Sequence, residues 1–298
     1  MPSVAAVARH NAGINLANKR FLVVGGTAGI GRATAIKLAS LQASVTIAGR
    51  NATAGSEIVA QLSSLNPTGA HEFHRVDMTS LKDIRRFATE FRNRHNTLHG
   101  TVISAGFMSM SGRTESEDGI DKKFQVHYYG RVALIRELLP LVKRTARGGE
   151  EDVRVMSVLA AGYGNTVDLD DLDLKKGYGI KAVADAASGY NDLAVNALSL
   201  ENPSISFIHI APGAIDTSLV DNLPWYFSKP AKLLGPLFLT KPETCAEFMA
   251  CALTADEYKK GWHLLSSKAE EIKPVAKYHT EQNVKRVWEH TLGLIEEK

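Results

Sequence analysis

A glycine-rich segment, GGTAGIG at positions 25–31, constrains the fold of this chain more than any other feature. Four apolar residues at 21–24 precede it, which is the pattern of a strand buried on both faces. From Ile30 onward, residues of one helical stripe recur at i, i+4, i+8 and i+11. A strand, a glycine turn and a helix in this order present backbone N–H groups and the positive helix end to a pyrophosphate. The segment therefore predicts a dinucleotide-binding turn. Its expected contact residues are Gly25, Thr27, Gly29, Ile30 and Gly31.

The rest of the chain alternates between short apolar runs and amphipathic runs. Strands are expected at about 43–48, 71–76, 98–103, 153–157 and 205–210, and helices at about 53–65, 81–95, 119–145, 182–200 and 279–296. Such alternation predicts an α/β fold, a Rossmann-like doubly wound parallel sheet of about seven strands with helices on both faces. We expect residues 1–15 to form a loose arm and 16–298 to form a single domain.

Composition excludes several classes of function. A net charge of +3 without a basic block does not indicate nucleic-acid binding. The first residues lack the apolar core of a signal peptide, and no stretch reaches the roughly 18 apolar residues of a membrane span. Cys245 and Cys251 are expected to pack on a helix without forming a disulfide. We therefore expect a cytoplasmic enzyme with a small-molecule substrate, either as a monomer or as a homo-oligomer.

Further motifs follow the glycine turn in a recognisable order. They are VDM around Asp77, ISAG with Ser104, Ala105 and Gly106, MSVLAAG with Ser157, and PGAIDT with Pro212, Gly213 and Thr217. With these motifs and its GxxxGxG spacing, the chain resembles the short-chain dehydrogenase/reductase family over about residues 16–265. It is similar to divergent members found in fungal natural-product pathways. The resemblance implies that Asp77 contacts the adenine amine and that Thr217 binds the nicotinamide carboxamide.

The residue at the end of the second expected strand indicates which cofactor is used. Folds that bind NAD usually carry an acid there, which bonds the ribose 2'-hydroxyl. This chain has Arg50, nineteen residues past Gly31, and the nearest acid is Glu57 inside the next helix. Because arginine makes bidentate bonds to phosphate, Arg50 favours NADP(H), with Arg32 as a second donor.

The catalytic residues depart from the family pattern. The family reduces a carbonyl with a tyrosine acid, a lysine that lowers its pKa, and a serine that binds the substrate oxygen. Ser157 matches the serine, but no YxxxK follows it. One hypothesis takes Tyr178 and Lys181 as a displaced pair, because residues at i and i+3 of a helix share a side. The alternative, a gap-free alignment back from Pro212, places Ala184 and Ser188 at these positions, so the pair would be lost.

Other candidates follow if the usual acid is absent. His127 takes the place of the family asparagine in the long helix, and histidine can hold a water or relay a proton. Arg131 lies one turn later, and Asp168 lies in an acidic loop. The aromatic and leucine-rich segment at about 214–240 is predicted to be a substrate lid, with a packed loop or a dimer contact as the alternatives.

Two classes of function remain at this point. The first is an NADPH-dependent oxidoreductase that reduces a ketone or imine of a small, fairly apolar substrate. The second is a dehydrogenase-like scaffold with little redox activity, acting as an isomerase, a cyclase or a ligand sensor. Both classes predict that NADPH binds, and they differ in turnover.

Overall fold

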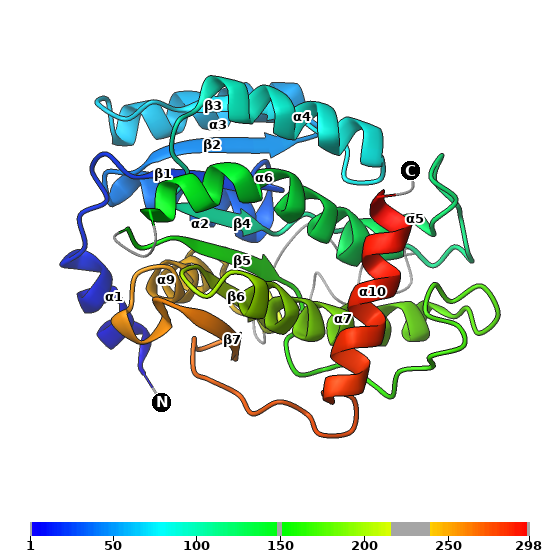
Figure 1. Ribbon diagram of the computed structural model, residues 1–298. Helices are drawn as coiled ribbons and strands as arrows, with labels where there is room; N and C mark the ends of the chain where they lie inside the picture. Colours follow the sequence, from blue (N-terminus) through cyan, green and yellow to red (C-terminus); the bar gives the residue numbers. More distant parts are fainter. Residues whose placement is uncertain (1, 148–150, 216–238, 297–298) are drawn as a thin grey trace.

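A single parallel sheet forms the centre of the computed structural model, which describes residues 2–147, 151–215 and 239–296. Its seven strands lie in the order β3-β2-β1-β4-β5-β6-β7 (Figure 1). They are β1 (Arg20–Val24), β2 (Ser44–Gly49), β3 (Glu72–Arg75), β4 (Gly100–Ile103), β5 (Arg154–Val158), β6 (Ser206–Ile210) and β7 (Gly261–Leu265). The strand order reverses between β1 and β4, which makes their carboxyl ends a ligand-binding crevice. The predicted doubly wound sheet is confirmed.

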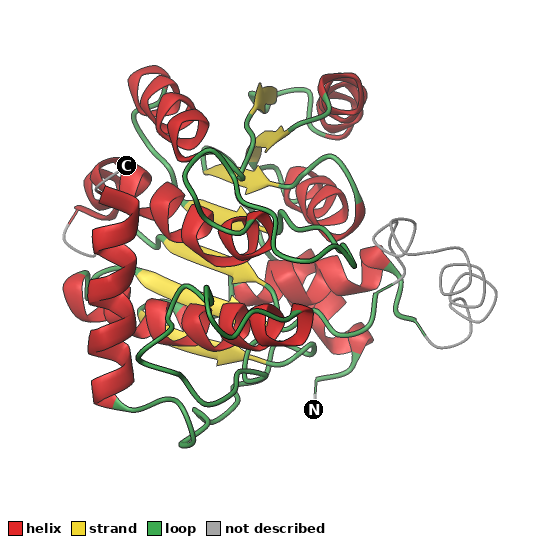
Figure 2. Ribbon diagram, turned by 90° about the vertical axis from the view of Figure 1, so that its right-hand side faces the viewer, coloured by secondary structure: helices red, strands yellow, loops and turns green. Residues whose placement is uncertain are grey.

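Helices cover both faces of the sheet (Figure 2). The helical elements are α1 (Val4–Ala12), α2 (Gly29–Ser40), α3 (Ala52–Leu65), α4 (Leu81–Arg94), α5 (Lys122–Phe124), a π-helical turn η1 (Gln125–Tyr129), α6 (Gly130–Ala146), α7 (Ile180–Glu201), α9 (Pro242–Ala252), a 3-10 turn η4 (Asp256–Tyr258) and α10 (Glu281–Glu296). One apolar cluster joins the sheet to α2, α3 and α9, and a larger one joins it to α4, α6, α7 and α10.

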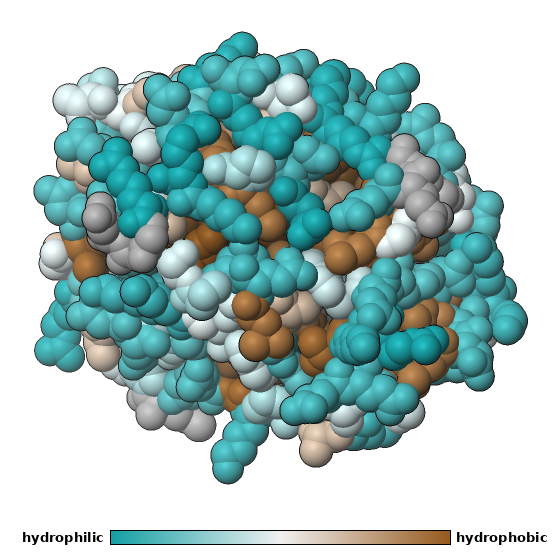
Figure 3. All heavy atoms as spheres, in the orientation of Figure 1, coloured by the Kyte–Doolittle hydropathy of each residue, from teal (hydrophilic) through white to brown (hydrophobic). Residues whose placement is uncertain are grey.

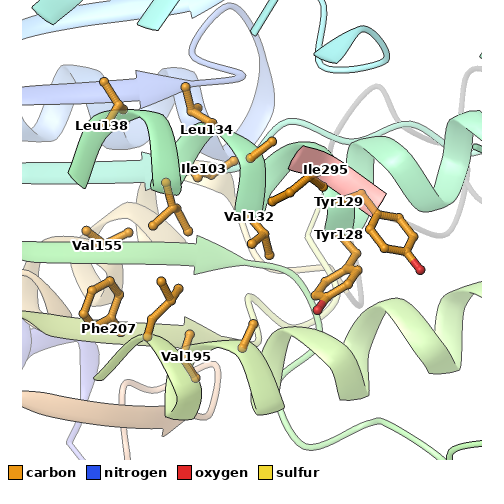
Figure 4. Packing of buried hydrophobic residues seen from close by; sticks show 14 of the residues in the cluster. Ile103, Tyr128, Tyr129, Val132, Leu134, Leu138, Val155, Val195, Phe207 and Ile295 are labelled. Atoms are coloured by element: carbon orange, nitrogen blue, oxygen red, sulfur yellow. The ribbon is translucent and has the colours of Figure 1, made fainter. Parts of the chain in front are cut away.

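The packing of α6 illustrates why the central strands read as continuous apolar runs. Val132 and Leu138 of α6 lie with Ile103 of β4 and Val155 of β5 in the larger cluster (Figure 4). All residues of β4, β5 and β6 are buried, because each of these strands is covered by helices on both faces. These three strands thus lie in the interior of the molecule.

The face shown in Figure 3 is mostly hydrophilic, with apolar atoms between the polar side chains. Among the described residues, none of the helices combines the length and the apolarity that crossing a bilayer requires.

The helix expected at 119–145 is interrupted, which corrects that prediction. Its first part is the short α5, followed by the π-helical turn η1 before α6 begins at Gly130. A Cβ at Gly130 would lie 2.7 Å from the carbonyl oxygen of Met78, so the glycine lets the helix approach that loop closely. Apolar periodicity does not reveal a π turn, since it adds one residue to a turn without changing the composition. Such turns are frequent at functional sites.

The N-terminal arm is also different from the prediction, because residues 4–12 form a helix docked on α9. Ser3 caps this helix by accepting a hydrogen bond from the Ala6 N–H. Val7 is buried, and the amide Nδ2 of Asn11 donates to Glu247 Oε2 at 2.6 Å and to the Glu247 carbonyl at 2.9 Å. A helix anchored by one apolar and one polar residue has too weak a stripe to be recognised in the sequence.

The expected lid at about 214–240 lies mostly at residues 216–238, outside the described residues, and so does Thr217. The flanking residues are joined, because the Thr240 N–H donates to the Ala214 carbonyl at 2.9 Å. The lid stays a prediction.

Replacing the polar anchor of α1 tests whether the arm is docked. We expect Asn11→Ala to lower the free energy of unfolding by about 1.5 to 3 kcal/mol, because it removes a buried hydrogen bond to a charged group. Arg9→Ala, on the exposed side of the same helix, is the control and should change little. Urea unfolding followed by circular dichroism measures both, and equal stability of the two variants would restore the loose arm.

A buried histidine makes stability depend on pH. Nδ1 of His99 accepts a hydrogen bond from the Arg20 N–H, and burial together with the charge of Lys19 lowers the His99 pKa to about 4. Between pH 6.5 and 4 the unfolded chain binds a proton that the folded chain does not. Stability should therefore fall with falling pH in this window, by at most about 1.4 kcal/mol per pH unit.

The measurement is the free energy of unfolding at pH 7, 5.5 and 4 for the native protein and His99→Gln. The variant cannot take up this proton, so its stability should fall less across the window. Parallel curves for the two proteins would show that another group governs acid unfolding.

Candidate functional site

The glycine turn brings the start of α2 against the ends of β1 and β4. Gly25 has φ +84°, and a Cβ there would lie 2.5 Å from the Ala105 backbone nitrogen. A Cβ at Gly31 would lie 2.6 Å from Ser104 Oγ and would collide with the Gly25 carbonyl oxygen. Both positions therefore exclude every side chain. Ala28, at the N-cap, makes no side-chain hydrogen bond, so the first N–H groups of α2 are left for a ligand.

A cavity of about 280 Å³ opens at this point, at the carboxyl ends of β1, β2 and β4. Nine predicted cofactor residues line it, namely Gly25, Thr27, Gly29, Ile30, Arg50, Asp77, Ser104, Ala105 and Gly106. The lining also includes Ala28, Gly49, Val76, Met78, Phe107 and Val126, which the motifs did not single out. Most of these residues are next in sequence to a predicted residue, and this adjacency is the feature of the sequence that could have indicated them. A close turn, free helix N–H groups and a cavity fit a dinucleotide phosphate.

The two predicted phosphate-binding arginines are placed differently. Arg50 is exposed, lines the cavity at the end of β2, and has no ion pair among the described residues. Arg32 does not line the cavity, and its Nη2 donates to Gln61 Oε1 of α3 at 3.0 Å. This difference makes Arg50 the candidate for a phosphate contact and Arg32 a bridge between α2 and α3.

Asp77 lies at the cavity but is partly engaged. Its Oδ1 accepts hydrogen bonds from the Thr79 N–H and hydroxyl at 2.9 and 2.8 Å. These bonds orient the carboxylate from one side. The expected adenine contact would use the other oxygen.

A second cavity, of about 380 Å³, lies at the carboxyl ends of β5, β6 and β7. The predicted Pro212 and Gly213 line it, and Gly213 has φ +80°. The lining is mostly apolar and comprises Leu159, Ala160, Ala161, Tyr163, Ala211, Pro212, Gly213, Ala214, Ser266, Ser267 and Ile272. An apolar cavity at the carboxyl edge of such a sheet is a candidate substrate pocket.

Ser157 ends β5 as predicted, but its hydroxyl is occupied. It is 2% exposed, donates to Asn191 Oδ1 at 2.8 Å and accepts from Arg131 Nη1 at 2.8 Å. Asn191 in turn donates to the His127 carbonyl at 2.8 Å. No motif indicated Asn191, since its role follows from the register of α7 against β5. The Ser157 hydroxyl therefore uses its donor on Asn191 and accepts a hydrogen bond from Arg131, both of them within the protein interior.

The structure does not bring Tyr178 and Lys181 together at either cavity. The two residues do not share one side of a helix, because α7 begins at Ile180 and Tyr178 precedes it. The Lys181 side chain is 83% exposed and pairs with Asp185 at 2.5 Å. Tyr178 packs instead under Lys123, whose ammonium lies 5.6 Å from the ring centroid.

The alternative positions on α7 are Ala184 and Ser188, and neither lines one of the two cavities. Ser188 is buried and its hydroxyl donates to the Ala184 carbonyl at 2.9 Å, a bond within the helix. Neither sequence alignment therefore places a tyrosine and lysine pair at the two cavities.

His127 lies in the π turn beside the cavity. Its Nε2 accepts a hydrogen bond from the Phe107 N–H at 3.3 Å, which leaves the proton on Nδ1. Burial, with the charge of Arg131, lowers the His127 pKa to about 3. The imidazole is therefore neutral near pH 7 and is a weak acid there. Asp168, the other candidate, is exposed and accepts from the Asp170 N–H.

A separate cluster of metal-type donors lies at the amino end of β3. Nε2 of His95 and His74 lie 2.6 and 3.2 Å from the Glu72 carboxylate. Arg20 and Arg94 place guanidinium nitrogens 3.7 and 3.6 Å from the same group. Burial alone would raise the Glu72 pKa, but the two histidines lower it to about 2. Two fixed cations this close would repel a divalent ion, so we assign an ion-pair network that ties β3 to α4.

Comparisons with known proteins agree with this architecture. The family model for short chain dehydrogenase matches residues 19–165. Oxidoreductase AN1596 of Emericella nidulans is 29% identical, with 100% of this chain and 99% of that protein covered. Mouse polyprenol dehydrogenase is 30% identical over 92% of this chain and 82% of that protein.

Solved structures share the fold. An uncharacterized protein from Mycobacterium paratuberculosis is 17% identical and superposes with a TM-score of 0.70 over 96% of this chain and 97% of that one. An alcohol dehydrogenase from Thermococcus sibiricus, complexed with 5-hydroxy-NADP, is 21% identical with a TM-score of 0.61 over 86% of this chain and 99% of that one. Taken with the sequence matches and the glycine turn, these comparisons show that the chain belongs to the short-chain dehydrogenase family.

Proposed function

We propose that this protein is an NADPH-dependent reductase of a carbonyl or imine group on a small, fairly apolar substrate. The observation that carries the cofactor choice is the position of Arg50, at the end of β2 where NAD-binding folds usually hold an acid. It lines the cavity with no ion pair among the described residues, so its charge is available to the ribose 2'-phosphate.

Each part of the dinucleotide has a matching group in the protein. The N–H groups at the start of α2 would bind the pyrophosphate, Arg50 the 2'-phosphate, and Asp77 the adenine amine. Gly213 and Pro212 would line the nicotinamide end, with Thr217 as a proposed partner of the carboxamide. The bound cofactor would supply a hydride.

The second cavity supports an apolar substrate. Most of its lining is aliphatic, and a 30% identical relative is a polyprenol dehydrogenase, named for an apolar substrate. The hydroxyl groups that line it are those of Tyr163, Ser266 and Ser267. Tyr163 is 72% exposed, and its phenol is an O–H donor of a type that serves as a general acid, so we propose it as the proton donor in place of the pair sought on α7.

A second candidate function rests on the occupied serine. Because Ser157 is bound by Arg131 and Asn191 and no tyrosine–lysine pair from α7 reaches the described cavities, the protein could bind NADPH without reducing a carbonyl. It would then act as an isomerase, a cyclase or a ligand sensor. This function predicts cofactor binding with no NADPH oxidation.

Turnover separates the two functions. We expect the native protein to oxidise NADPH with at least one apolar ketone or imine of a broad panel, followed by the loss of NADPH absorbance. Tyr163→Phe should lower this rate at least about tenfold, because general acids contribute about 10² to 10⁴. Tyr178→Phe, the matched control, should keep the rate. Loss of activity in Tyr178→Phe alone would restore the displaced pair, and no oxidation with any substrate would favour the second function.

Cofactor selectivity is tested at Arg50. We expect Arg50→Ala to weaken NADPH binding by about 1.5 to 3 kcal/mol, as for a charged hydrogen bond, and to leave NADH binding unchanged. Arg32→Ala is the matched control, since Arg32 donates to Gln61 and should change neither affinity. Isothermal titration calorimetry measures both cofactors. Equal affinity of the native protein for NADH and NADPH would overturn the assignment.

A further inference from the structure

Arg131 is a buried cation that binds the chain at the carboxyl ends of β4 and β5. It is 1% exposed and is the second residue of α6, one position past Gly130. Its Nη2 donates to the Ala105 carbonyl at 2.7 Å, and its Nη1 donates to the Val158 carbonyl at 2.9 Å and to Ser157 Oγ at 2.8 Å. A weaker bond from Nε reaches the Val126 carbonyl at 3.2 Å. Four of its five N–H donors are therefore used on the site's own framework.

All the acceptors of this guanidinium are neutral. None of the carboxylates in the described parts of the chain forms an ion pair with Arg131, although a buried charge is normally paired. The buried Asp192 of α7 forms no ion pair with Arg131. Its carboxylate instead forms hydrogen bonds with His209 Nδ1 and the Tyr278 hydroxyl, each at 2.5 Å, and with the Gly162 N–H at 3.1 Å. Burial lowers the Arg131 pKa to about 9, so the group stays charged near pH 7.

The guanidinium of Arg131 contacts chain segments that line, or directly adjoin the lining of, both cavities. Ala105 and Val126, whose carbonyls Arg131 binds, line the dinucleotide cavity. Val158, which it also binds, directly precedes Leu159 in the lining of the substrate cavity. The guanidinium thus lies at the carboxyl ends of β4 and β5, in contact with residues of or next to the linings of the two cavities.

We propose that Arg131 is a specificity-determining residue that makes this site bind the reduced cofactor more tightly than the oxidised one. This inference rests on the proposed nicotinamide site. The oxidised nicotinamide ring carries a positive charge that the reduced ring lacks. A fixed cation with neutral partners repels the former and not the latter, and low-dielectric surroundings strengthen this difference. The preference would help a reductase to load NADPH and to release NADP⁺.

The test compares dissociation constants for NADPH and NADP⁺ by calorimetry. We expect the native protein to prefer NADPH about tenfold or more, because a fixed unit charge at an effective dielectric of about 20 acts on the charged oxidised ring and not on the neutral reduced ring. Arg131→Met, which keeps the length without the charge, should reduce the preference to about twofold or less. Arg131→Lys should retain most of it. Arg136→Gln removes a half-buried arginine of the same helix, which pairs with Glu201 and Glu296 away from both cavities, and as the matched control for net charge it should retain all of the preference.

The outcomes distinguish the charge from a packing role. A merely structural residue would weaken both cofactors equally in Arg131→Met and leave their ratio unchanged, which overturns the inference. If Arg131→Met does not fold, the native protein still decides, because equal affinity for NADPH and NADP⁺ contradicts the inference without any variant. If NADH binds as well as NADPH, the proposed NADPH selectivity fails, but the ratio of NADH to NAD⁺ tests Arg131 in the same way. Binding of neither cofactor overturns both proposals.

Discussion

The close packing of the glycine turn and the first turn of α2 against the segment after β4 determines the geometry of the site. A side chain at Gly25 or Gly31 would have to occupy the space of the Ala105 backbone or of Ser104. Because neither position has one, α2 begins close to the sheet and its unpaired N–H groups face a cavity. The same contact fixes the loop after β4, whose Ala105 carbonyl then accepts a hydrogen bond from Arg131.

Polar side chains organise the other half of the site from inside the core. Arg131, Ser157 and Asn191 join α6, β5 and α7 through hydrogen bonds of 2.8 Å. A buried network of this kind stabilises one arrangement only when its members are satisfied, since a lone buried polar group costs about 1 to 3 kcal/mol. The Ser157 hydroxyl is therefore held within this network, and the hydroxyl groups that line the second cavity come from Tyr163 and from the segment after β7.

Most of the fold and most of the lining of the candidate cofactor cavity could be predicted from the sequence, because both depend on local patterns. The apolar run at 21–24 and the glycines after it act within a few residues, and Arg50 follows a strand whose end is easy to place. The reacting end was harder to predict. Tyr178 and Lys181 were paired by helical spacing, but the helix begins between them at Ile180. The contact of Asn191 with Ser157 depends on how α7 lies over β5, which no spacing rule encodes.

The central claim is that the cavity at the ends of β1, β2 and β4 binds NADP(H) through the glycine turn and Arg50. A crystal structure of the protein soaked with NADPH tests it most directly. We expect pyrophosphate density at the N–H groups of residues 28–31 and the 2'-phosphate within hydrogen-bond distance of the Arg50 guanidinium. Pyrophosphate bound elsewhere, or a 2'-phosphate directed away from Arg50, would contradict it.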